Sequence, residues 1–169
     1  MNISRIFKTV VPFILFSSFI FSEDYKVEVG IESITQDNGK YNISVYIINP
    51  YVSIAGIQFK IIPSDIFSIE EIHGGKAVGA GFQIHKNKKG IILGFSMLGN
   101  TIPAAITTAG PNRFKDNIAL NIVATSDRIP LETMLEMECV MASKGGESLP
   151  TKFIPFDLSN ILYLEENKK

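Results

Sequence analysis

Apolar and polar residues alternate along most of the chain, and this period of two is typical of half-buried β-strands. In segments 25–32 and 41–47 the odd positions are apolar, and most even positions are polar or glycine. Asp37, Asn38 and Gly39 separate the two segments, and Asn and Gly accept the positive φ angles of a tight hairpin turn. The pattern therefore predicts two paired antiparallel strands whose odd-numbered side chains fill a core.

The other strands are predicted from the same alternation and from the turn residues between them. A strand at 57–61 is expected to end before Pro63, because proline cannot donate a ladder hydrogen bond. A second hairpin is expected where 82–85 and 91–97 flank the turn at 87–90. Further strands are expected at 66–72, 117–124, 135–141 and 153–163, and connections at 73–81 and 99–116, the second with at most one turn of helix. No helical period is sustained, so the chain is predicted to be all-β: a two-sheet antiparallel β-sandwich.

The first 22 residues have the pattern of a secretory signal peptide. Arg5 and Lys8 precede an apolar stretch at 9–21, and Ser22 supplies a small residue for cleavage. The stretch is shorter than the about 20 residues of a membrane-spanning helix, although an anchor left in place is the alternative. We therefore expect a signal peptide at 1–22, a single domain at 23–169, and no membrane span in the mature form. The expected location is extracellular or periplasmic, in association with the cell envelope.

Charge and cysteine content narrow the classes of function. The chain has 16 Lys and Arg against 17 Asp and Glu, so no basic surface for nucleic acid is expected. Cys139 is the only cysteine, which excludes an intramolecular disulfide. The alternation around it points its side chain into the core, where a thiol is unreactive.

The sequence shows no recognisable motif of catalytic or cofactor-binding residues. The run from Gly94 to Gly99 has one residue too many for the Gly-x-Ser-x-Gly motif of hydrolases, and His73-Gly74-Gly75 is more simply a turn. Two histidines and one inward cysteine do not predict a zinc site. Calcium suits sandwich loops better, but no loop has the acidic spacing of a calcium site. The chain is thus not expected to be an enzyme, and no cofactor is predicted.

The order of several short motifs resembles the cohesin domain family over residues 26–163. These motifs are Ile54–Phe59, His73–Ala77, Gly81–Ile84, Leu93–Ser96 and Ile102–Ala104. The resemblance implies the jelly-roll sandwich that cohesins share with cellulose-binding modules of types 2 and 3. It also implies a non-catalytic module that binds a dockerin-like protein in extracellular polysaccharide use. Cohesins of cellulosomes carry Asn and Asp side chains on the strand where this chain has Gly56 and Gln58.

Candidate binding residues are polar or aromatic side chains expected to face outward. They are Tyr46, Tyr51, Gln58, Lys60 and His85. The chain has no Trp, so Tyr46 and Tyr51 are the candidates for stacking on a sugar, and direct carbohydrate binding is the alternative to a protein partner. A structural subunit that pairs strands at its edges is a third possibility. Ile48, Ile62 and Ile92 are expected on an outer face, either as a docking patch or under the 99–116 connection.

Overall fold

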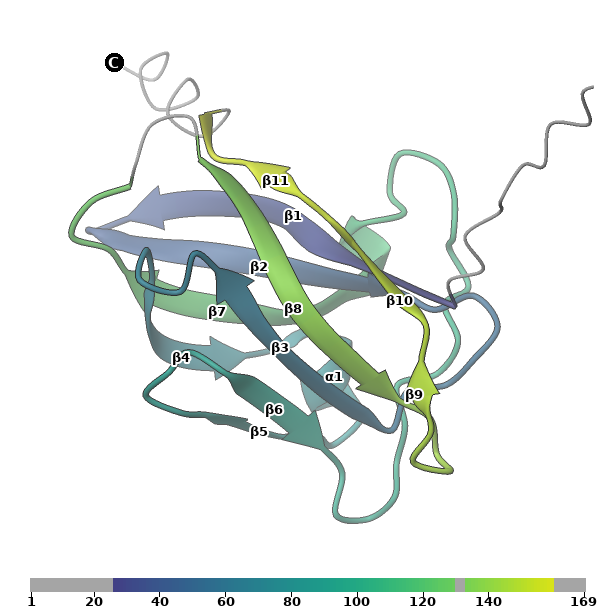
Figure 1. The fold of residues 1–169 in the computed structure, drawn as a ribbon. Helices are drawn as coiled ribbons and strands as arrows, with labels where there is room; N and C mark the ends of the chain where they lie inside the picture. The colour runs from purple at the N-terminus through teal and green to yellow at the C-terminus, as the bar shows by residue number, and fades with distance from the viewer. Residues whose placement is uncertain (1–25, 130–132, 160–169) are drawn as a thin grey trace, which may run out of the picture.

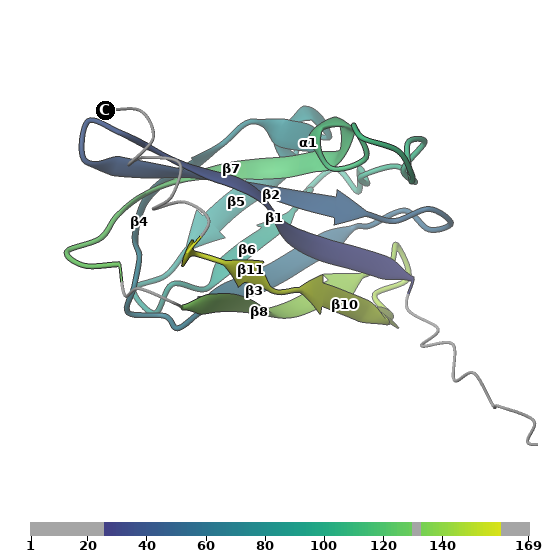
Figure 2. The same cartoon turned by 90° about the horizontal axis from the view of Figure 1, so that it is seen from above.

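The structure is a computed structural model that describes residues 26–129 and 133–159. Two β-sheets pack face to face as a jelly-roll sandwich, which confirms the predicted all-β fold class (Figure 1). Seen from above, β1, β2 and β7 form one layer and β3 and β8 the other (Figure 2). The predicted signal peptide at 1–22 lies outside the described residues.

The first sheet has five strands, of which all neighbours are antiparallel except β10 and β1, which run parallel. In spatial order they are β10 (Thr151–Ile154), β1 (Val27–Asp37), β2 (Lys40–Ile48), β7 (Ile118–Thr125) and β4 (Ser68–His73). β1 and β2 form the predicted hairpin, in which Asn38 and Gly39 take φ angles of 50° and 78°.

The second sheet is antiparallel throughout. In spatial order its strands are β11 (Phe156–Asp157), β8 (Met134–Ala142), β3 (Gly56–Ile62), β6 (Ile92–Phe95) and β5 (Gln83–Lys86), and β9 (Ser148–Leu149) also pairs with β8. β5 and β6 are the second predicted hairpin, and β3 ends at the residue before Pro63 as expected.

The core lies between the sheets and is filled largely by the predicted odd positions. These include Val27, Val29, Ile43, Val45, Ile47, Ile57, Phe59, Ile61, Leu135 and Met141. β1 departs from the simple alternation because a bulge between Ile31 and Ser33 inserts an extra residue. Ile34 therefore enters the core at an even position.

Residues 99–117, which we call the strap, cross the outer face of the first sheet. Tyr46 and Ile48 on β2 are buried there with Ala105, and Phe114 and Ile118 pack against them. The strap contains one short 3-10 helix, η1 (Lys115–Asn117), as the sequence predicted. Apolar side chains on both faces of the first sheet are thus removed from water, and this stabilises the layer.

Two buried asparagines hold the strap in place. The Asn49 side chain donates to the carbonyl oxygens of Val52 and Pro103, at 2.6 and 3.0 Å. The Asn117 side chain donates to the carbonyl oxygens of Thr107 and Arg113, at 2.6 and 2.7 Å. These amide groups donate to backbone carbonyls outside the regular strands and so tie the strap to the first sheet.

Two expectations about the chain's local structure are wrong. The connection at 73–81 contains a helix, α1 (Gly75–Gly79), which the glycine-rich composition concealed. The strand expected at 153–163 is instead two short strands, β10 and β11, separated by Pro155 and belonging to different sheets. Residues 160–163 of that expected strand lie outside the described residues. Proline interrupts the ladder and lets the chain change sheets.

Candidate functional site

The outer face of the second sheet is exposed, unlike that of the first. We call the surface formed by Gln58, Lys60, His85, Leu93 and Val140 the open face. These residues lie on β3, β5, β6 and β8, and β8 and β3 stand in front of β1 and β2 in Figure 1. The described residues include no segment like the strap packed on this face.

A row of four side chains runs straight across the open face. Val140 on β8 is directly opposite Gln58 on β3, and Gln58 is directly opposite Leu93 on β6. Leu93 is in turn opposite His85 on β5. Directly opposed side chains on one face have Cβ atoms about 5 Å apart, so the four form one continuous surface. Leu93 and Val140 are 41% and 49% exposed, so the row offers apolar surface to a partner.

The rows on either side give the open face a mixed character. Lys60 is directly opposite Glu138, which places opposite charges next to the apolar row. On the other side Gly56 is opposite both Phe95 and Ala142, and the Phe95 ring lies 6.2 Å from that of His85. An apolar centre with polar and charged neighbours is the composition of protein-binding surfaces.

The structure shows where three candidate binding residues lie, and their role in binding stays a prediction. Gln58, Lys60 and His85 do lie on one surface, brought together by strand pairing. The expected patch of Ile48, Ile62 and Ile92 does not form. Ile92 is fully buried opposite Phe59, Ile48 is buried under the strap, and Ile62 is partly buried at the end of β3. Because residues 91–93 are all apolar, the sequence does not show which of them point into the core. The pairing of β6 with β3 decides this.

Tyr46 was expected to face solvent, and this expectation is wrong. Its side chain is on the outer face of the first sheet, but the strap covers it and leaves it 2% exposed. Its ring packs against the ring of Phe114 with centroids 4.5 Å apart. Opposite it on β1 is Gly30, where a Cβ atom would lie 2.5 Å from the tyrosine oxygen. Tyr46 therefore packs the strap onto the sheet.

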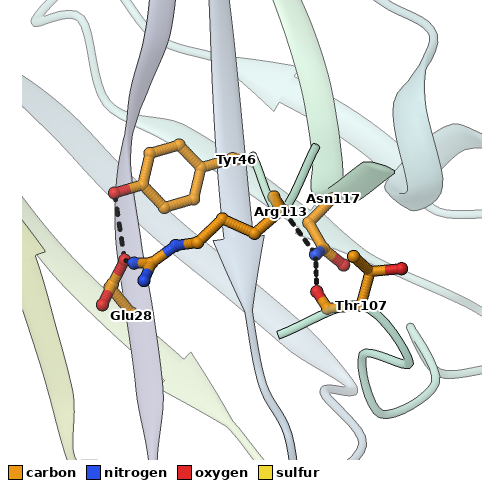
Figure 3. Close-up of polar contacts among 5 residues, drawn as sticks. All are labelled: Glu28, Tyr46, Thr107, Arg113 and Asn117. Carbon is orange, nitrogen blue, oxygen red and sulfur yellow. Dashed lines mark hydrogen bonds and ion pairs between the residues drawn. The ribbon is translucent and has the colours of Figure 1, made fainter. Parts of the chain in front are cut away.

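A partly buried ion pair lies beside Tyr46 (Figure 3). Arg113 on the strap donates from Nη2 to Oε1 of Glu28 on β1, and the Tyr46 hydroxyl donates to the same oxygen at 3.2 Å. The guanidinium carbon of Arg113 also lies 4.5 Å from the centre of the Phe114 ring. Glu28 and Arg113 are 85 residues apart, so no local pattern in the sequence relates them.

Tyr51 is exposed as expected, and it borders a pocket at the edge of the strap. The side chain is 87% exposed. The pocket has a volume of about 180 Å³ and is lined by Glu28, Ile48, Pro50, Tyr51, Thr108 and Arg113. The two predicted groups of binding residues therefore lie on opposite layers of the sandwich, with Tyr51 on the strap side and Gln58, Lys60 and His85 on the open face.

The titratable groups do not form a site for metal chemistry. Within residues 26–129 and 133–159, no three His, Cys, Asp or Glu side chains come together as metal ligands. The same residues contain no helix long and apolar enough to cross a lipid bilayer. Cys139 packs against the core as predicted, and burial raises the pKa of its thiol to about 12.

The raised pKa predicts that the Cys139 thiol reacts slowly with alkylating reagents. At pH 8 the native protein should react with iodoacetamide at least about 100-fold more slowly than the protein unfolded in guanidinium chloride, because the thiolate is the nucleophile. A matched control is Val140→Cys in a Cys139→Ser background, since Val140 is the outward neighbour on β8. Equal rates for Cys139 and the control thiol would contradict the buried position.

Comparison with solved structures gives cohesins as structural neighbours of this chain. No protein-family model matches the chain, and no curated protein matches it in sequence. A non-cellulosomal cohesin from the archaeon Archaeoglobus fulgidus superposes with a TM-score of 0.53 and 13% identity, over 85% of this chain and 99% of the cohesin. A type I cohesin–dockerin complex from Clostridium thermocellum superposes with a TM-score of 0.51 and 19% identity, over 78% of this chain and 96% of the matched chain. The CaDoc0917–CaCohA2 complex superposes with a TM-score of 0.55 and 11% identity, again over 78% of this chain and 96% of the matched chain.

These neighbours establish the fold of the chain. The described sandwich is a cohesin-like domain, as the order of its sequence motifs suggested. At this level of identity the likeness concerns architecture, and function must be argued from this chain's own surface. The relation to cellulose-binding modules stays a prediction.

Proposed function

We propose that this protein is a non-catalytic module that binds another protein through the open face. The observation that carries the proposal is the row of Val140, Gln58, Leu93 and His85, which places two exposed apolar side chains between polar ones on an uncovered sheet. Apolar surface kept exposed in this way favours contact with a partner. On the first sheet, the strap covers the outward apolar side chains of Tyr46 and Ile48.

The partner that best fits this proposal is a dockerin-like protein. Several solved cohesins with this fold are in complexes with dockerins, which supports a protein rather than a small-molecule partner. We further propose that the protein is secreted and acts at the cell envelope in polysaccharide use, on the strength of the signal-like segment at 1–22 and the cohesin resemblance. Gln58 and His85 then provide the polar contacts that select the partner.

A charge placed on the open face should abolish partner binding. We expect Leu93→Asp to weaken capture of the partner by at least about 100-fold, because the carboxylate would be desolvated at the centre of the interface. The purified protein is immobilised and exposed to the culture medium and envelope extract of the source cells, and retained proteins are identified by mass spectrometry. The midpoint of thermal unfolding is measured in parallel to show that the variant is folded, because Leu93 is 41% exposed and Asp is a poor strand former.

The matched control is Ile106→Asp, which adds the same charge to an exposed apolar residue of the strap. One recurrent partner retained by wild type and Ile106→Asp but lost with Leu93→Asp is the expected result. A partner held equally by Leu93→Asp would contradict the assignment of the open face. Hydrolysis of a glycan or ester by the purified protein would contradict the non-catalytic role.

A further inference from the structure

The pocket at the edge of the strap is built from three separate parts of the chain. β1 contributes Glu28, the loop after β2 contributes Pro50 and Tyr51, and the strap contributes Thr108 and Arg113. It lies on the layer opposite the open face, so a ligand bound here would leave the protein-binding surface free. This pocket has no part in the proposed protein contact.

Tyr51 gives the pocket an exposed aromatic wall. Its side chain is 87% exposed, whereas Tyr46 is buried and Tyr41 packs against the core. The exposed ring of Tyr51 borders the pocket and is available for contact with a ligand. A ligand with an apolar face of its own would cover the ring.

The polar wall of the pocket is held in place and is electrically balanced. The guanidinium of Arg113 is fixed by its pairing with Glu28 (Figure 3) and by its position over the Phe114 ring. Its Nε atom is buried and meets no hydrogen-bond acceptor among the described residues. Because Nε is out of contact with solvent, a ligand in the pocket would meet the exposed part of the Arg113 side chain. Because Glu28 balances the charge of Arg113, the pair does not favour an anion over a neutral ligand.

We propose that this pocket binds a single neutral sugar ring at the end of a glycan. A pyranose combines an apolar face, which would lie on Tyr51, with hydroxyl groups that hydrogen-bond to Thr108 and Arg113. The volume of about 180 Å³ is below the roughly 300 Å³ at which pockets for drug-sized ligands begin, which fits one ring rather than several. The Glu28–Arg113 pair and Tyr51 are thus a pre-arranged site for hydroxyl groups beside an aromatic platform.

Nuclear magnetic resonance titration of the purified protein tests this site. The probes are the methyl glycosides of glucose, galactose, mannose and xylose, with glucuronate as a charged comparison. At least one neutral glycoside should shift the backbone amide signals of Tyr51, Thr108 and Arg113, with a dissociation constant on the order of millimolar. Tyr51→Ala should weaken this response at least about tenfold, whereas Tyr51→Phe, which keeps an aromatic ring, should retain it.

Two control variants establish that the response comes from the pocket itself. Ile106→Ala removes an exposed apolar side chain of the strap that does not line the pocket, and it should leave the response unchanged. Leu93→Asp should also leave it unchanged, so that failure of the protein-binding proposal does not affect this test. Absence of a response to every neutral glycoside, a response to glucuronate alone, or a response kept in Tyr51→Ala would overturn the proposal.

Discussion

Gly75→Ala is expected to lower the free energy of unfolding by about 2 to 5 kcal/mol, a large share of a typical domain's stability. Gly75 begins α1 with a φ of 69°, a region that costs an L-residue about 1 to 2 kcal/mol. An added Cβ atom would also lie 2.3 Å from the carbonyl oxygen of Ala119 on β7. This neighbour is backbone inside a sheet, so it cannot move aside without disturbing the ladder.

Gly79→Ala is the matched control for this prediction. Gly79 ends the same helix, and an added Cβ atom there would meet nothing within 4 Å. We expect that substitution to be neutral or to stabilise the protein by up to about 1 kcal/mol. Guanidinium titration of the two variants measures the difference. Equal midpoints for Gly75→Ala and Gly79→Ala would show that α1 does not approach β7 as closely as described.

Arg113→Met is expected to lower the free energy of unfolding by about 3 kcal/mol. The substitution keeps much of the side-chain volume but removes the guanidinium that pairs with the Glu28 carboxylate, whose side chain is only 10% exposed. A buried charge that loses its partner costs more than the pair contributes. The strap would also lose the contact of the guanidinium with the Phe114 ring.

Glu28→Gln should cost less, about 1 kcal/mol, because Arg113 is 32% exposed and can turn its charge toward water. Adding Glu28→Gln to Arg113→Met should then recover stability relative to Arg113→Met alone, since no buried charge remains. Denaturant titration of the two single variants and the double variant measures the coupling. A double variant whose loss equals the sum of the two single losses would contradict the pairing of Glu28 with Arg113.

The two faces of the sandwich differ in how much of their surface is exposed. The strap and the Glu28–Arg113 pair close the outer face of the first sheet, except for the small pocket beside Tyr51. The second sheet keeps its outer face available, and its apolar residues Leu93 and Val140 stay in water. The two proposals follow this asymmetry: a protein partner is proposed for the exposed layer, and a smaller ligand for the pocket on the other layer.

Part of the candidate site could be predicted from the sequence. Gln58 and Lys60 follow from the alternation in β3, and Tyr51 follows from its place after a strand and a proline. Leu93 was missed because it is the third residue of an unbroken apolar run. Such a run has no alternation of apolar and polar residues to show which side chains point outward. The hypothesis that Tyr46 is exposed failed because alternation identifies the face of a sheet and says nothing of what later covers it.

The sequence by itself determined most of the strands, the two hairpins and most of the core, because side-chain alternation and the turn chemistry of Asn38 and Gly39 act between near neighbours in the chain. Only the tertiary structure decided which outer face is closed. That choice depends on Arg113 reaching Glu28 and on Phe114 covering Tyr46, contacts between residues far apart in the sequence. The tertiary structure also decided the parallel pairing of β10 with β1 and the inward position of Ile92. Both depend on the partner strand rather than on the segment itself.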